Sequence, residues 1–344
     1  MPDPDTLVAE LRRSPLAGAA SLIQALGLGS QPTFSRLVAR AGDRVVAVGS
    51  ARARRYAASR DVQGLGRQVP LFRVDEGGRL ERIASLRPIE PAGLVVDGER
   101  AGAFEGLPGF IDELRPTGFL GSAFAQRVAG LGLAGDPREW SDDETLLALA
   151  SAGEDLPGDL VVGDESARRY YAWRAGDVDV VERDARPQRY VALAADAIRG
   201  VVPGPTVSGE QPKFGAVIAA DAGTQHVLVK FSPSEYSPAA RRWCDLLVGE
   251  HLALETLRSH GVPAVTSTIV EGGSRVFLET SRFDRVGLFG RRAVAPIEPR
   301  PEIHAFGRFI DDTGVKPGAM AYGMSPMGYA PIGADVPARA YAPP

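Results

Sequence analysis

The sequence predicts an α+β protein in which a winged helix-turn-helix is followed by two further regions of mixed helices and strands. Three observations lead to this fold class. Residues 1–65 combine short helical patterns with a basic hairpin, residues 66–200 mix strand and helix patterns, and residues 201–344 open with a glycine-rich loop before two strands and a helix. Because 344 residues exceed what one hydrophobic core usually serves, these three ranges are the predicted domains.

The composition is that of a globular chain and excludes several classes of protein. Hydrophobic residues make up 44% and charged residues 24%, which excludes a collagen-like or wholly disordered chain. Cys244 is the only cysteine, so an internal disulfide is excluded. The sequence has no apolar run near the ~18 residues of a membrane span, and its first residues do not form a secretory signal. We therefore expect a cytoplasmic location and no membrane partner.

The most specific pattern in the first domain is the segment 30–42, which predicts a helix with one apolar and one polar face. Ser30 is placed to cap this helix, Pro32 suits its first turn and Gly42 ends it. Short polar and basic side chains, which suit contacts with base edges and phosphates, lie largely off the apolar face. They are Gln31, Thr33, Ser35, Arg36 and Arg40.

The residues around this helix complete the layout of a DNA-binding domain. Two shorter helical patterns precede it, and an apolar strand with a basic return follows at 43–59. Residues 1–70 hold ten arginines against five acidic residues, and the stretch 26–42 resembles the turn and recognition helix of many bacterial repressors. Double-stranded DNA is the partner that this interpretation predicts. The alternative is a helical dimerisation module with a solvated basic hairpin.

The second domain offers no arrangement of a nucleophile and a base. Strand patterns come first, and a helix, a turn and another helix follow over residues 107–133. Asp142 and Asp143 form the most tempting carboxylate pair. We predict that they lie at the start of a helix, where carboxylates interact favourably with the helix dipole.

The pattern that indicates chemistry begins after residue 201, with a loop rich in glycine, proline and hydroxyl residues. Two apolar strands follow, the second ending at Lys230, and then a helix with Glu250 near its centre. These elements follow one another in the same order in the small lobe of a protein kinase. There, glycine lets backbone amides approach phosphates, the lysine pairs with the phosphates, and the glutamate holds the lysine. The alternative is an ordinary α+β domain with a surface lysine.

Lysine is rare in this chain, since Lys213, Lys230 and Lys316 are the only lysines among 39 basic residues. Lys213 ends the glycine-rich loop and Lys230 ends the second strand. A lysine retained in a chain that otherwise uses arginine is consistent with a need for a compact ammonium group. The alternative is three leftover lysines on the surface.

Three segments resemble the HipA family, which comprises bacterial serine/threonine kinases of toxin–antitoxin systems. They are SGEQPKF at 208–214, LVKFSP at 228–233 and LETSRFDR at 278–285. The stretches 114–124 and 138–163 resemble the YjjJ-like branch, in which a DNA-binding domain is fused to the kinase. The resemblance covers roughly residues 1–290. It implies a HipA-like kinase fold for the third domain, ATP and magnesium as cofactors, and a protein substrate or an antitoxin-like protein as partner.

Carried onto this sequence, the resemblance implies a nucleotide site. Its loop would consist of Ser208, Gly209, Glu210, Gln211 and Lys213. Lys230 would contact the phosphates, with Glu250 as its partner from the helix. Glu279 and Phe283 would lie in the segment that meets the adenine. Thr206 and Ser208 lie where relatives carry an autophosphorylated serine, and a phosphate there would repel the phosphates of a nucleotide.

The sequence departs from the family where kinases carry their catalytic and magnesium-binding aspartates. In register with the family motifs, Gly314 replaces the catalytic aspartate and Gly323 replaces the magnesium aspartate. The chain contains no asparagine, so the asparagine of the catalytic loop is missing too. Loss of a general base alone costs about 10²–10⁴-fold in rate. The metal ligands therefore stay unassigned.

Two functions stay open on these grounds. One is a HipA-like serine/threonine protein kinase fused to a DNA-binding domain, in which Asp311 or Asp312 serves as the catalytic residue of a rebuilt loop. The other is a DNA-binding transcriptional regulator with a catalytically dead, kinase-like half. In both, the second lobe of the kinase is expected to be reduced.

Overall fold

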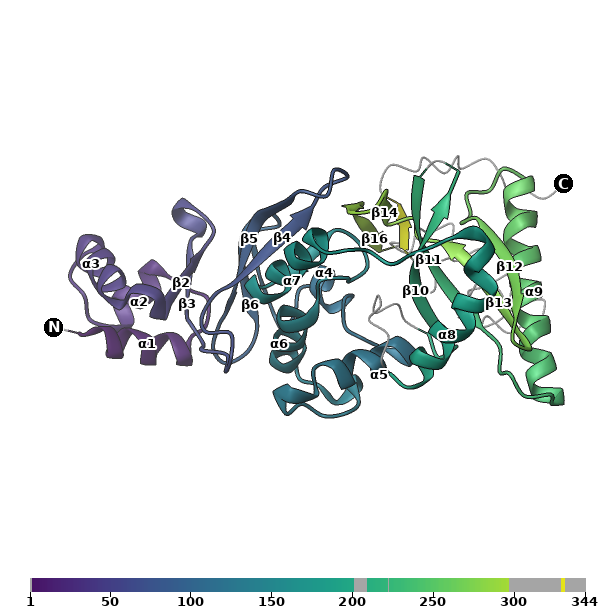
Figure 1. The fold of residues 1–344 in the computed structure, drawn as a ribbon. Helices are drawn as coiled ribbons and strands as arrows, with labels where there is room; N and C mark the ends of the chain where they lie inside the picture. Colours follow the sequence, from purple (N-terminus) through teal and green to yellow (C-terminus); the bar gives the residue numbers. More distant parts are fainter. Residues whose placement is uncertain (1, 201–208, 222, 297–328, 332–344) are drawn as a thin grey trace, which may run out of the picture.

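The computed structural model describes residues 2–200, 209–221, 223–296 and 329–331, and the account below concerns these residues. They form three groups of helices and strands that follow one another in a row (Figure 1). A small three-stranded sheet with three helices lies at one end, and two five-stranded sheets, each with its own helices, make up the rest. The predicted α+β class is confirmed.

The N-terminal group contains α1 (Pro4–Arg13), β1 (Ala17–Gly18), α2 (Ala19–Ala25), α3 (Gln31–Ala41), β2 (Val45–Val48) and β3 (Arg55–Ala58). Its strands pair antiparallel in the order β1-β3-β2. Pro32 lies in the first turn of α3, and Gly42 ends the helix with a φ of +61°, as predicted. The predicted cap is different, because the hydroxyl of Ser30 lies 3.0 Å from the hydroxyl of Thr33 rather than on a backbone amide.

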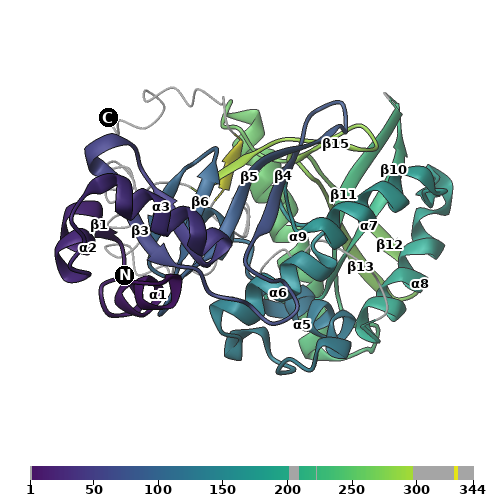
Figure 2. The same ribbon diagram turned by 90° about the vertical axis from the view of Figure 1, so that its left-hand side faces the viewer.

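The core of this group confirms the predicted apolar face of α3. Phe34 is fully buried, and its ring meets that of Tyr56 on β3 edge to face, with the centroids 5.1 Å apart. Buried residues from all three helices surround this pair: Leu7, Leu11, Leu22, Leu37 and Ala41. The polar side of α3 is thereby left exposed, and Figure 2 shows the helix from this end of the molecule.

The middle group is a sheet of five antiparallel strands in the order β7-β6-β5-β4-β8. Its strands are β4 (Val69–Val74), β5 (Leu80–Pro88), β6 (Leu94–Gly98), β7 (Gly102–Phe104) and β8 (Leu160–Val162), and its helices are α4 (Gly109–Asp112), α5 (Gly118–Arg127), α6 (Asp142–Ala152) and α7 (Asp164–Ala175). Apolar residues of the strands and of α6 share one core. Ser141 and Glu144 form a capping box at the start of α6, with Asp142 and Asp143 in its first turn, as predicted.

The C-terminal group is a sheet in the order β12-β13-β11-β10-β9, in which β9 runs parallel to β10 and the other pairs are antiparallel. It contains β9 (Val180–Val181), α8 (Arg186–Ile198), β10 (Lys213–Ala220), β11 (Gly223–Phe231), α9 (Pro238–Ser259), β12 (Ser267–Gly272) and β13 (Arg275–Ser281). Short pairs follow, formed by β14 (Arg285–Val286) with β15 (Gly290–Arg291) and by β16 (Val294–Pro296) with β17 (Tyr329–Pro331).

The two long helices of this group lie on opposite faces of the sheet. Successive side chains of β11 alternate between the faces. Val229 and Phe231 pack with Tyr190 of α8, whereas Lys230 contacts Glu250 of α9. The core between α8 and the sheet includes residues of β9 and α8, which lie before residue 201, where the sequence analysis began the third domain. The C-terminal packing unit therefore begins near residue 180.

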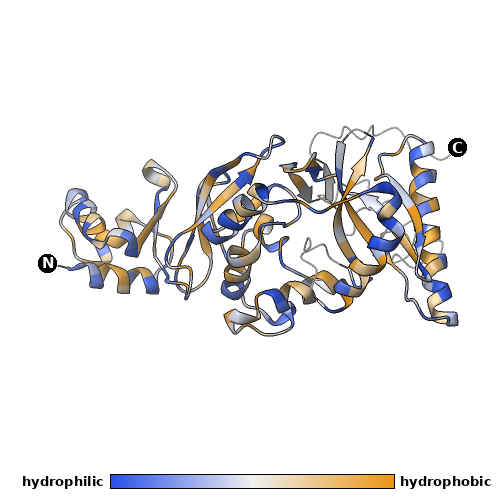
Figure 3. Ribbon diagram, in the orientation of Figure 1, coloured by the Kyte–Doolittle hydropathy of each residue, from blue (hydrophilic) through white to orange (hydrophobic). Residues whose placement is uncertain are grey.

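The hydropathy of the residues agrees with this arrangement of sheets and helices. The strands carry long apolar stretches, while the helices show both apolar and polar residues (Figure 3). Among the residues that the structure describes, no helix combines the length and the apolar character that crossing a membrane requires.

Candidate functional site

The structure brings together two lysines and a glutamate that the sequence singled out. Lys213 and Lys230 lie directly opposite each other on β10 and β11, so their side chains share one face of the sheet. They are 1% and 3% exposed. The Nζ atom of Lys230 lies 2.5 Å from Oε1 of Glu250, which α9 places over this face. The result is a buried ion pair with a second ammonium group beside it.

The end of the glycine-rich loop is anchored at the same place. The carbonyl oxygen of Gly209 accepts a hydrogen bond from Nζ of Lys213 at 3.1 Å and another from the backbone amide of Phe119 at 3.1 Å. A Cβ at Gly118, which has a φ of +64°, would lie 2.6 Å from that oxygen. Glycine is therefore required at the start of α5 for the loop to approach so closely.

The remaining loop residues offer polar groups near these lysines. Glu210 is exposed and Gln211 is half-buried. The amide nitrogen of Gln211 is buried and has no hydrogen-bond partner in the described part of the chain. A buried donor without an acceptor is costly, so this group fits a ligand that supplies acceptor oxygens.

Electrostatics distinguish the two lysines. Burial, followed by the nearby ammonium group of Lys230, lowers the pKa of Lys213 to about 7, although the carboxylates of Glu250 and Glu210 act in the opposite direction. Lys213 therefore changes charge near neutral pH. An anionic ligand in this place would favour the protonated form of its side chain.

The structure does not bring the side chain of Glu279 together with Lys230 and Glu250. Glu279 lies opposite Val229 and therefore on the α8 face, away from Lys230. It is buried there, accepts a hydrogen bond from the Tyr190 hydroxyl at 2.5 Å and contacts Nη1 of Arg186 at 3.3 Å. Strand alternation is the physical reason, because neighbouring residues of β13 point to opposite faces.

Phe283 lies half-buried in the turn after β13, between charged residues that are fully engaged with the middle group. Arg282 contacts Asp155 at 3.1 Å and Asp284 at 2.8 Å, and Arg285 contacts the same two aspartates at 2.6 and 2.7 Å. Burial disfavours ionisation of Asp155, but the two guanidinium groups outweigh it and hold the pKa of Asp155 well below its usual range. This buried network joins the C-terminal sheet to the loop after α6.

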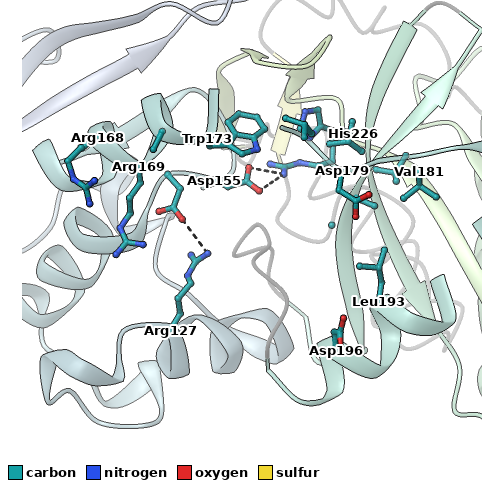
Figure 4. Close-up of a pocket in the computed structure, with 18 residues that line it drawn as sticks. Arg127, Asp155, Arg168, Arg169, Trp173, Asp179, Val181, Leu193, Asp196 and His226 are labelled. Atoms are coloured by element: carbon teal, nitrogen blue, oxygen red, sulfur yellow. Dashed lines mark hydrogen bonds and ion pairs between the residues drawn. The ribbon is translucent and has the colours of Figure 1, made fainter. Parts of the chain in front are cut away.

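A cavity of about 750 Å³ lies between the middle and C-terminal groups and was not anticipated from the sequence (Figure 4). Arg127, Arg168 and Arg169 stand on one side of it, and Asp179 and Asp196 stand on the other. Its described lining includes neither Lys230 nor Glu250. The lining comes from many short segments, so no linear motif signals it.

The side chains predicted to contact DNA share the outer side of α3. Gln31, Ser35, Arg36 and Arg40 are exposed, and Thr33 is half-buried. The hairpin of β2 and β3 follows the helix, and Arg54 and Arg55 on its return are exposed. The structure thus leaves the predicted DNA-contacting side chains on the outer side of α3, while the apolar side of the helix is turned inward.

Several predicted residues lie outside the described residues. They are Thr206, Ser208, Asp311, Asp312, Gly314, Lys316 and Gly323. In the described ranges, no cluster of three or more histidine, cysteine, aspartate or glutamate side chains is arranged to hold a metal ion. No metal ligand is therefore assigned from the structure.

Comparison with known proteins places the chain in a family. Residues 65–171, which span the middle sheet and its helices, match the family model described as the YjjJ-like toxin, middle domain. The chain is also 38% identical over 308 residues to the protein named Toxin YjjJ of Escherichia coli (strain K12), across 88% of this chain and 67% of that relative. The chain therefore belongs to the YjjJ-like toxin family.

The depressed pKa of Lys213 leads to a prediction about stability. Its pKa is about 7 in the folded protein against the 10.5 that is ordinary for a lysine side chain, so the unfolded chain binds more protons between these pH values. Stability should therefore rise with pH across this window, by at most about 1.4 kcal/mol per pH unit from this residue. Lys213→Met should remove that part of the slope. Denaturant unfolding at pH 6.5 to 9.5 measures the free energy of unfolding as a function of pH. Equal slopes in the unaltered protein and in Lys213→Met would contradict a lowered pKa for Lys213.

Proposed function

We propose that this protein is a HipA-like, ATP-binding protein of kinase descent, fused to a winged helix-turn-helix that binds duplex DNA. The observation that carries the nucleotide part is the buried cluster of Lys213, Lys230 and Glu250 at the end of the glycine-rich loop. The Lys230–Glu250 pair has the form of the lysine–glutamate pair that positions ATP phosphates in protein kinases.

The donors around this cluster suit phosphate oxygens. Burial lowers the pKa of Lys213 most, and repulsion by the neighbouring ammonium group of Lys230 lowers it further. A phosphate group between the two ammonium groups would relieve that repulsion and also accept the unpartnered N–H of Gln211. Lys230 and Lys213 would then hold the phosphates, Glu250 would fix the orientation of Lys230, and the backbone at Gly209 would allow close approach.

Phosphoryl transfer itself is not supported by the sequence. Gly314 and Gly323 stand where relatives place the catalytic and magnesium aspartates. These replacements favour the second candidate function, a regulator whose kinase-like half binds nucleotide without transferring phosphate. The relative's name is that of a toxin, which supports an antitoxin-like protein as a further partner.

The DNA part of the proposal is supported by the N-terminal group. Its third helix packs an apolar face inward and exposes short polar and basic side chains, and a two-stranded hairpin with exposed arginines follows. This is the arrangement with which winged helix-turn-helix domains place a helix in the major groove and a hairpin beside the backbone.

Lys230→Met is expected to weaken ATP binding at least about tenfold, because it removes a charge-assisted contact from the phosphates. Isothermal titration calorimetry with and without magnesium measures the affinity, and circular dichroism checks folding. Arg258→Ala is the matched control, since Arg258 pairs with Glu255 on the surface of α9, away from the lysine cluster. Failure of the unaltered protein to bind ATP under either condition would refute the nucleotide site.

Incubation with radiolabelled ATP should give no labelled protein, because a general base and a metal-binding carboxylate are both replaced by glycine. Autophosphorylation that Asp312→Ala abolishes would overturn this expectation. It would show that the chain is an active kinase with a rebuilt catalytic loop.

Arg36→Ala should weaken binding to duplex DNA and lower the slope of log affinity against log salt by about one unit, because one phosphate contact is lost. Fluorescence anisotropy with a labelled duplex at several salt concentrations measures both quantities. Arg168→Ala serves as the control, since this exposed arginine lies on α7 in the middle group. Binding that is indifferent to salt, or absent at low salt, would rule out the DNA function.

A further inference from the structure

A second cluster of cationic groups lies where the N-terminal group meets the middle sheet. Four arginines from three segments line a cavity of about 280 Å³ there: Arg12, Arg44, Arg60 and Arg67. Arg12 lies in the last turn of α1, Arg44 precedes β2, and the other two lie between β3 and β4. Asp61, Glu90, Val8 and Ser59 complete the lining. None of these residues takes part in the nucleotide or DNA site proposed above.

The arginines are held in place but retain donors. Arg44 contacts Asp5 at 2.5 Å, and Arg60 pairs with Asp143 and donates from Nε to the carbonyl of Ile89. Arg67 donates from Nη1 to the carbonyl oxygen of Ser59 at 2.9 Å. Each guanidinium group has five N–H donors, so these contacts leave several directed elsewhere.

Arg12 is the most loosely held of the four. Its Nη2 atom lies 3.6 Å from Glu90, which is too long for a good hydrogen bond, and its side chain is 61% exposed. It therefore has donors for a ligand.

The buried hydroxyl of Ser59 points to an absent acceptor. Ser59 is 4% exposed and lines the cavity, and its Oγ atom has no hydrogen-bond partner among the residues that the structure describes. The backbone groups of Ser59 do have partners. Its amide donates a hydrogen bond to the carbonyl oxygen of Arg44, and its carbonyl oxygen accepts one from Nη1 of Arg67. A buried hydroxyl is normally satisfied by a partner, and the ligand that suits both it and the surrounding guanidinium groups is an oxyanion.

We infer that this cavity is a binding site for the phosphate group of a small molecule. Arg12 and Arg67 bind the phosphate oxygens, and the hydroxyl of Ser59 donates to one of them. The volume suits a small phosphate ester rather than a whole nucleotide. Because Arg12 belongs to the N-terminal group and Arg67 lies in the segment that leads into the middle sheet, a phosphate bound by both is held at the junction of the two groups.

The test uses inorganic phosphate as the probe and the full chain in the Lys230→Met background, so that the proposed nucleotide site does not contribute. Phosphate, at constant ionic strength set with chloride, should raise the unfolding temperature. Arg67→Ala should weaken phosphate binding at least tenfold, and Ser59→Ala should weaken it less. Arg168→Ala should leave it unchanged. Arg12→Ala, which removes an exposed side chain, is the second variant if Arg67→Ala fails to fold.

Two outcomes would overturn the inference. Phosphate could leave the unfolding temperature unchanged, or the shift could be equal in Arg12→Ala, Arg67→Ala and Arg168→Ala. If the first outcome came with weaker duplex DNA binding by Arg12→Ala, the cluster would be a contact for the DNA backbone. The ATP and DNA assays above probe Lys230 and Arg36, whereas this test compares Arg12, Arg67 and Ser59, so failure of this site and failure of the proposed function can be told apart.

Discussion

The ion pair between Lys230 and Glu250 ties the long helix of the C-terminal group to its sheet. An ammonium group that is 3% exposed needs a carboxylate within reach, and α9 provides it from across this face of the sheet. The pairing of β10 with β11 then sets Lys213 beside it. Through the hydrogen bond of Lys213 to Gly209, the same cluster ties the glycine-rich loop to the start of α5.

The parts of this arrangement that sequence could predict are those governed by local periodicity. The apolar spacing in residues 30–42 gave the inward face of α3, and the order of loop, strands and helix indicated that Lys230 and Glu250 would meet. Composition supported the choice of lysines, because two of the three in the chain fall in this cluster. The nucleotide and DNA that these residues are proposed to bind remain predictions.

The features that the sequence analysis did not predict depend on the face of a strand to which a side chain points and on contacts between segments that are distant in the chain. The interpretation of Glu279 from sequence did not say which face it takes, and its place opposite Val229 turns its side chain toward Tyr190. The cavity beside Arg127 and the cluster around Ser59 are each assembled from several segments, so no stretch of sequence displays them. The segment after β13 was interpreted through a family motif, whereas its charges serve to join two parts of the molecule.

That junction bears on how such a protein can evolve. The carboxylate of Asp155 pairs with Arg282, 127 positions away in the chain, and with Arg285, so two of its ion-pair partners come from the C-terminal group. A recombination event that exchanged the C-terminal group alone would separate Asp155 from these partners. The middle and C-terminal groups are therefore expected to be inherited as a pair, because a replacement for the C-terminal group alone would have to supply matching arginines for Asp155.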